Sequence, residues 1–254
     1  MSAPGTAGAA PTHRRVLAQA RFELAAVLRN GEQLMVTVAL PLVALIVLTS
    51  ATAIELSTAG LPRVDVVAPG VLAFAVLSAA FTSPAIATAF DRRNGVLRLL
   101  ATTPLGRSGL LAGKVAAVLG VQLLSGTLLV LTGAAMGWRP SAAGLVMAAA
   151  VGVLGTAAFV ALALLVAGTL RAEAVLAVAN LVLIALALGG GVLVPVDDLP
   201  GPLAALAPWL PSGALGEALR AALTTGTVPA GPIVVLVVWA AALSAAVARF
   251  FRWD

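Results

Sequence analysis

The sequence contains no cysteine and only one histidine, and charged side chains occupy 10% of its 254 positions. Without cysteine the chain can form no disulfide bond and has no thiolate chemistry. Because 61% of the residues are hydrophobic, the sequence leaves no room for a soluble domain of any size. We therefore do not expect a separate catalytic module.

Six long stretches carry no charged side chain except Lys114, near the start of the third. A helix advances about 1.5 Å per residue, so roughly 20 apolar residues cross the hydrocarbon core of a bilayer. A soluble helical bundle would need polar helix faces, which these stretches lack. We therefore predict an all-α polytopic membrane protein with six transmembrane helices, near Leu34–Ile54, Ala68–Phe90, Leu110–Met136, Ala142–Leu170, Ala174–Val194 and Ala230–Ala248.

Basic residues fall almost entirely in alternate gaps between these stretches. Twelve of the 15 share one side, which the positive-inside rule makes the cytoplasmic side. We predict cytoplasmic termini, the inner (plasma) membrane of a prokaryote, and loop charges that face lipid headgroups rather than a nucleic acid. The twelve are Arg14, Arg15, Arg21, Arg29, Arg92, Arg93, Arg98, Arg107, Lys114, Arg171, Arg249 and Arg252, and the other three are Arg63, Arg139 and Arg220.

The N-terminal region divides into a disordered tail (residues 1–12) and an amphipathic helix (residues 13–30) that ends at Asn30-Gly31. Such a helix lies along the cytoplasmic membrane surface. Phe22 points between Arg15 and Arg29, either as an interfacial aromatic, which we favour, or as a contact with a protein partner. The predicted apolar face holds Val16, Leu17, Ala20, Leu24, Val27 and Leu28, and Arg15, Gln19, Glu23 and Arg29 face away.

The most informative hydrophilic segment, residues 91–107, lies between spans 2 and 3. Apolar Val96, Leu97 and Leu100 with basic Arg93 and Arg98 predict a short two-faced helix, which Pro104 stops. A solvated loop retained for topology would explain the basic residues but not the leucines. We therefore interpret the segment as a docking helix.

This segment resembles the permease subunit of type 2 ATP-binding-cassette (ABC) exporters, a group that includes daunorubicin-resistance-type multidrug permeases. The resemblance extends to helix 13–30 and to the Gly/Pro-containing run after span 5, with its Leu-Pro and Ala-Leu-Arg. It implies a coupling helix (91–107) that binds a separate ABC ATPase, and a connecting helix (13–30) beside it. It also implies short re-entrant helices (195–226) that dip into the membrane from outside, and a second permease subunit, identical or related.

The same resemblance assigns roles to individual residues. Many relatives carry an acidic residue where Arg98 stands, so we expect different salt bridges to the ATPase here. The assigned residues are Asp91, Arg92, Arg93, Gly95, Val96, Leu97, Arg98, Leu100, Pro104 and Arg107 in the coupling helix and Arg15, Phe22 and Arg29 in the connecting helix. Separately, the prolines after span 5 prevent a continuous helix, so we predict an outer gate there, with Pro195, Asp197, Asp198, Glu217 and Arg220.

The energy for transport must come from another chain. A phosphate-binding loop needs Gly-x-x-x-x-Gly-Lys-Ser/Thr, but Gly113-Lys114 is followed by Val115, and Ser108 stands where the first glycine belongs. We expect no cofactor bound by this chain, with ATP and Mg²⁺ held by the partner subunit. The function predicted is efflux of a hydrophobic or amphipathic drug or lipid, and the alternative is a non-transporting scaffold of an ATPase complex. An intramembrane hydrolase is not expected, because His13 lies in the tail and no carboxylates pair within the bilayer.

Polar groups inside the spans are few and weak. Without a titratable group at depth, a proton- or sodium-driven carrier is not expected. Gln122 and Asn180 are predicted to form hydrogen bonds between helices, about 1 kcal/mol each, with pathway lining as the alternative. Small residues predict close helix packing at Gly126 with Gly133 and at Gly152 with Thr156.

The outer segment contains four residues of special interest. Asp197 and Asp198 are expected to cap a turn or, alternatively, to attract cationic substrates. Glu217 and Arg220 stand three residues apart on a short helix, so we predict an ion pair between them.

Overall fold

The computed structural model describes residues 10–51 and 60–251, and every regular element in these ranges is a helix. Most of the tail predicted for residues 1–12, the predicted end of span 1 at Ile54, and Arg252 lie outside the described residues. A first helix, α1 (Thr12–Arg29), precedes span 1, which consists of α2 (Gly31–Leu34), the π-helical turn η1 (Met35–Ala39) and α3 (Leu40–Ser50). Span 2 consists of α4 (Arg63–Leu77), the π-helical turn η2 (Ser78–Thr82) and α5 (Ser83–Arg93).

The remaining elements are a short helix, four long helices and an irregular segment. They are α6 (Val96–Ala101), α7 (Gly106–Ala135), α8 (Ala142–Thr169), α9 (Ala172–Gly189), η3 (Val196–Asp198), α10 (Gly201–Leu206), η4 (Ala207–Trp209), α11 (Pro211–Thr224) and α12 (Ala230–Phe250).

The predicted six spans are confirmed: within the described residues, six helical stretches are long and apolar enough to cross a membrane, at Gly31–Ser50, Arg63–Arg93, Gly109–Ala135, Ala142–Thr169, Ala172–Gly189 and Ala230–Phe250. Span 2 begins five residues earlier than predicted. Its first residue, Arg63, donates from Nε to the Leu48 carbonyl at the end of span 1, so its charge is stabilised at the helix start. Span 5 ends five residues earlier than predicted, because Gly191 turns the chain with a φ of +77°.

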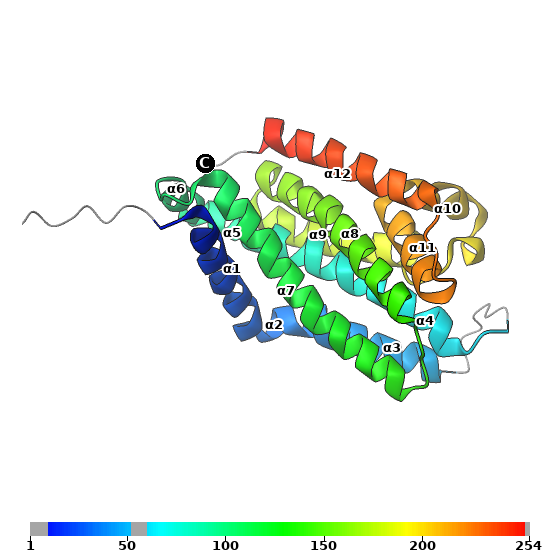
Figure 1. Ribbon diagram of the computed structural model, residues 1–254. Helices are drawn as coiled ribbons and strands as arrows, with labels where there is room; N and C mark the ends of the chain where they lie inside the picture. The colour runs from blue at the N-terminus through cyan, green and yellow to red at the C-terminus, as the bar shows by residue number, and fades with distance from the viewer. Residues whose placement is uncertain (1–9, 52–59, 252–254) are drawn as a thin grey trace, which may run out of the picture.

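The bundle is built around α8, which packs against α12, α11 and α5 (Figure 1). The main apolar core surrounds Leu77, Phe81, Phe159 and Leu215, all with exposed fractions of 0%. A second cluster surrounds Trp138, which closes the turn after α7. Packing of these large buried side chains helps to fix the relative positions of the spans.

Four parts of the chain meet at one end of the bundle: the start of α1, α6, the α8–α9 connection and the last turn of α12 (Figure 1). Phe251, after α12, packs directly on Gly168 near the end of α8. The Arg92 guanidinium, before α6, donates to the Leu170 carbonyl that follows α8. We call this end the basic end, because most of the exposed arginines lie there, and the opposite end the far end. Elements from both ends of the described chain meet here, as expected for an even number of crossings.

The packing of α1 differs from the prediction. Its inner face lies along α7, where Val16 approaches Gly109, Gln19 packs on Gly113 and Leu24 packs on Gly120. A Cβ at Gly113 would lie 2.6 Å from Cγ of Gln19, so only glycine admits α1 this closely. These glycines, missed in the sequence, form a groove on α7.

The predicted orientation of α1 was therefore wrong in part, since Val16, Ala20, Leu24 and Val27 are partly or fully covered as predicted. Gln19 and Glu23, expected to face away, lie on the packed side, whereas Leu17 and Leu28, expected to be covered, are 49% and 40% exposed. Polar partners on α7 account for the difference, as described below. The close helix packing predicted at Gly126 is not seen within the chain, because nothing lies within 4 Å of a Cβ built there.

Candidate functional site

The short helix α6 projects at the basic end, between α5 and α7. Gly95 supplies the turn that separates it from α5, with a φ of +74° that side chains rarely adopt. The helix ends at Ala101, two residues before Thr103 and three before Pro104, so the predicted two-faced helix is present but shorter than residues 91–107. The side chain of Arg107 lies outside the described residues.

The exposed face of α6 differs from the predicted docking face. Leu97 is 1% exposed and belongs to the interior of the bundle, and Leu100 is half-buried. Leu99, which the sequence analysis did not single out, is 69% exposed, and Val96 and Arg98 are exposed beside it. The face that could contact another protein is therefore Val96, Arg98 and Leu99. The sequence could not distinguish Leu97 from Leu99, because both lie in the same run of leucines.

Three residues assigned to the coupling helix belong instead to the last turn of α5. Asp91, Arg92 and Arg93 each bind a different neighbour. Arg92 donates to the Leu170 carbonyl, and Arg93 forms an ion pair with Glu173 in the first turn of α9 while lying over the Phe90 ring. Both side chains of that ion pair are more than half exposed, so it contributes about 0 to 1 kcal/mol.

Asp91 turns inward to a buried lysine. Lys114 Nζ lies 2.8 Å from Asp91 Oδ2 and 3.0 Å from Glu23 Oε1 of α1, and the lysine side chain is only 4% exposed. Glu23 also accepts a hydrogen bond of 2.9 Å from Gln19 Nε2. This cluster, which we call the Lys114 cluster, joins α1, α5 and α7 at one point. It explains why Gln19 and Glu23 face α7 rather than water.

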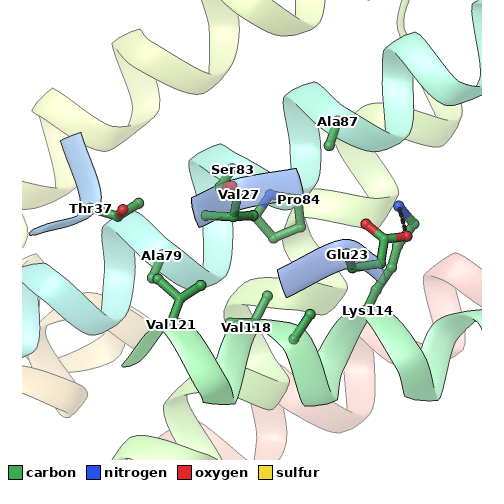
Figure 2. Close-up of a pocket in the computed structure, with 11 residues that line it drawn as sticks. Glu23, Val27, Thr37, Ala79, Ser83, Pro84, Ala87, Lys114, Val118 and Val121 are labelled. Carbon is green, nitrogen blue, oxygen red and sulfur yellow. Dashed lines mark ion pairs between the residues drawn. The ribbon is translucent and has the colours of Figure 1, made fainter. Parts of the chain in front are cut away.

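Figure 2 shows Lys114 and Glu23 of this cluster at the edge of a small cavity between α1, η1, η2, α5 and α7. The cavity has a volume of about 30 Å³, and its wall contains Glu23, Thr37, Ser83 and Lys114 among apolar side chains. Its volume suits a water molecule rather than a transported substrate.

The outer face of α1 carries the residues assigned to the connecting helix. Phe22 is 69% exposed and Arg29 is exposed, as predicted for an outward pair. Arg15 is partly covered and donates to Thr12 Oγ1 over 3.2 Å.

At the far end, Arg220 binds backbone rather than Glu217. Its guanidinium donates to the carbonyls of Gly191 and Val192, which follow span 5, so it fastens α11 to the end of α9. Among the described residues, the ion pairs formed do not include the predicted one with Glu217, whose side chain is exposed. Burial lowers the pKa of Arg220 to about 10, opposed by the charges of Glu217 and Asp198, so Arg220 stays charged at neutral pH.

The other outer-gate residues lie in the turn that precedes α10. Pro195 begins the single turn of η3, and Asp197 and Asp198 are exposed in it, without a side-chain cap on the helix. The expected short helices, η3, α10, η4 and α11, are present.

Comparison with known families identifies this arrangement of spans and loops. The model of a family described as the ABC-2 type transporter matches residues 14–224, which is most of the chain and includes α1, α6 and α11. The chain belongs to the ABC-2 type transporter family. No curated protein matches it significantly. Members of the family act as the membrane permease of an ABC transporter, so this chain is a transport subunit.

The polar residues inside the spans of this ABC-2 permease differ in their surroundings. Gln122 of α7 forms the predicted contacts between helices: Nε2 donates to the Val76 carbonyl over 3.3 Å, and Oε1 accepts from Thr156 Oγ1 over 2.8 Å. Asn180 does not, because it is exposed on α9 and donates to the Leu176 carbonyl of its own helix. Within one permease chain the two side chains therefore do not line a common path.

Proposed function

We propose that this ABC-2 permease is the membrane subunit of an ATP-driven exporter for hydrophobic or amphipathic molecules, drugs or lipids, with a separate ATPase bound at the basic end. The observation that carries the proposal is α6, a short helix at that end whose exposed face combines Val96 and Leu99 with Arg98. Val96 and Leu99 together place exposed apolar surface on a basic helix, and an exposed apolar patch with a polar rim is typical of a contact site for a protein partner.

The same surface includes the outer side of α1, with exposed Phe22 and exposed Arg14, Arg21 and Arg29. These two surfaces are joined internally by the Lys114 cluster, since Glu23 lies on α1 and Asp91 lies five residues before α6. An ATPase that moves α6 would therefore also move α1 and the entrance of span 3.

The ATPase is expected on a separate chain because the single Gly-Lys pair here has a structural role. Gly113 admits Gln19 of α1, and Lys114 lies in the buried ion cluster within α7. A phosphate-binding loop needs its lysine and backbone amides free for nucleotide. ATP and Mg²⁺ would therefore be bound by the partner.

The substrate class follows from the chemistry of the spans. Beyond Lys114, span 3 carries no charged residue as far as Ala135, and spans 4 and 5 carry none between Ala142 and Thr169 or between Ala174 and Gly189. Charged solutes and coupling protons need ionisable groups along their route. An uncharged route suits drugs or lipids that partition into the bilayer, and a second permease subunit would complete it.

The test is co-purification of the permease with its ATPase from the native membrane, for the wild type and for Leu99→Asp. We expect Leu99→Asp to weaken the affinity for the ATPase by a factor of about 30 or more, as for a residue that anchors an interface. Thr227→Asp, an exposed position between α11 and α12, is the matched control and should retain the ATPase. Leu97→Asp should instead destabilise the permease, because Leu97 is buried.

If Leu99→Asp retained the ATPase at the wild-type level, the assignment of Val96, Arg98 and Leu99 as the docking face would be wrong. The wild-type complex in liposomes should also hydrolyse ATP faster when a hydrophobic drug or lipid is added, and should move it out of the compartment that holds the ATPase. A complex whose ATPase activity no such compound changes would support a scaffold instead.

A further inference from the structure

Spans 1 and 2 share an unusual backbone feature. Each contains one π-helical turn, η1 in span 1 and η2 in span 2, where the α-helix widens for five residues. Such turns are uncommon, are seen mostly as single turns inside α-helices, and recur at functional sites. Two of them in neighbouring spans therefore need an explanation.

A proline in the same register accounts for each turn. Pro41 and Pro84 are each the second residue of the α-helix that follows the π-turn. In a regular α-helix a proline ring collides with the carbonyl four residues earlier, here Thr37 and Ala80, the middle residues of η1 and η2. Widening the turn moves these carbonyls away from the rings. The sequence shows the two prolines but not that they act as a pair.

The two π-turns lie against each other and are joined by side-chain hydrogen bonds. Pro41 has no N–H to donate to the Val36 carbonyl, and Ser78 Oγ of η2 approaches that carbonyl at 3.4 Å instead. Gln33 Nε2, before η1, donates to Ser83 Oγ, after η2, over 2.8 Å. The Val36 carbonyl, which Pro41 leaves without a donor, is thus approached by span 2, and a bond between side chains joins the two spans at the same level.

A small cavity lies beside the paired turns. The cavity of about 30 Å³ in Figure 2 borders Thr37 of η1, Ala79 of η2 and Ser83, and it reaches Glu23 and Lys114 on its other side. The Thr82 hydroxyl of η2 is buried and finds no partner among the described residues. A close-packed interior resists movement. At this point the chain instead has two prolines that cannot donate a backbone hydrogen bond, a buried hydroxyl without a partner among the described residues, and a small cavity.

We propose that spans 1 and 2 bend together at a hinge formed by η1 and η2. The hinge lies between α3 and α4 on one side and the parts of the two spans that lead to α1 and α6 on the other. Bending there changes the angle of both spans at once because Ser78 and Gln33 tie the turns together. The hinge is a property of this chain and does not depend on the proposed ATPase or substrate.

The experiment is amide hydrogen exchange on the permease alone, in lipid nanodiscs, read by mass spectrometry of peptides that cover spans 1 and 2. We expect amides in and just after η1 and η2 to exchange about tenfold or more faster than amides in α3, since each proline removes one N–H donor from the helix hydrogen bonds at the turn. Replacing both prolines, Pro41→Ala with Pro84→Ala, should remove most of this difference. Uniform exchange along both spans would overturn the proposal.

Pro69→Ala is the matched control, because Pro69 lies inside α4 of the same span without a π-turn beside it. It should leave exchange at η2 unchanged. A second variant, Ala79→Val, fills part of the cavity without touching a proline and should slow exchange at both turns, because the two bend together. If Pro41→Ala alone slowed exchange at η1 and left η2 unchanged, the turns would bend independently and the paired hinge would be wrong.

Discussion

Replacing Lys114 with methionine removes the only cation from a cluster that contains two carboxylates. The lysine is 4% exposed, and its partners Asp91 and Glu23 are 30% and 17% exposed. Breaking a fully buried ion pair costs about 3 to 5 kcal/mol, because the remaining charge is left uncompensated. Water reaches both carboxylates in part, so we expect a loss of about 2 to 4 kcal/mol in the free energy of unfolding.

The assay is reversible unfolding of the purified permease in mixed micelles of a mild detergent and sodium dodecyl sulfate. The chain contains four tryptophans, so its intrinsic fluorescence reports unfolding. Arg21→Met is the matched control, because Arg21 is an exposed cation on α1. Its free energy of unfolding should stay within about 0.5 kcal/mol of the wild type.

A triple variant separates charge from packing. When Lys114→Met is combined with Glu23→Gln and Asp91→Asn, no uncompensated charge remains, and most of the lost stability should return. If Lys114→Met were as stable as Arg21→Met, or if the triple variant were no more stable than Lys114→Met, the ion cluster would not hold α1, α5 and α7 together.

Three further pairs of substitutions test other contacts by the same unfolding measurement. Gly113→Ala should be less stable than Gly126→Ala by about 1 to 3 kcal/mol, since a Cβ at Gly113 meets Gln19 of α1 whereas Gly126 faces open space. Equal stabilities would exclude a tight α1–α7 groove. Arg220→Ala should cost about 2 to 4 kcal/mol because two carbonyls lose their donor, while Glu217→Gln should cost less than about 0.5 kcal/mol. A large loss of stability in Glu217→Gln would instead support the ion pair between Glu217 and Arg220. Gln122→Leu should lower the free energy of unfolding by about 1 kcal/mol, and Thr156→Val by no more, since Thr156 also donates to the Gly152 carbonyl of its own helix. A larger loss for Thr156→Val would mean that the hydrogen bond to Gln122 is not the main contribution of Thr156.

The spans could be predicted from the sequence because their signal is long and uniform. Roughly 20 apolar residues without charge have no stable alternative to a helix in the membrane, so all six were found. Their ends were less certain. Arg63 begins span 2 although it is charged, because its side chain reaches the Leu48 carbonyl, and no local pattern reveals such a partner.

The contacts between elements were harder to predict than the elements. Lys114 was assigned to the basic loop, and Asp91 to a docking surface, although the two meet within the bundle. A lysine just inside a span was the available signal, since such a residue needs a partner. Its partners lie 23 and 91 residues earlier in the chain, a separation at which periodicity carries no information.

The orientation of short helices was predicted least well. In α1, hydrophobicity placed Leu17 and Leu28 inside, but the buried lysine draws Glu23 toward α7 and rotates the helix. In α6, six residues include three leucines, so hydrophobicity does not select a face. Packing against α5 and α7 determines which face of α6 is buried, and Leu97 lies on that face.

The last turn of α5 shows how movement at the basic end would pass into the bundle. Consecutive residues of a helix point about 100° apart, so Asp91, Arg92 and Arg93 reach three different neighbours: Lys114 of α7, the end of α8 and Glu173 of α9. The strengths of these contacts differ. The Arg93–Glu173 pair is exposed and adds about 0 to 1 kcal/mol, whereas the Lys114 cluster is worth several times more. A force applied to α6 is therefore expected to move α7 and α1 first and α9 least, which places the strongest coupling beside the paired π-turns of spans 1 and 2.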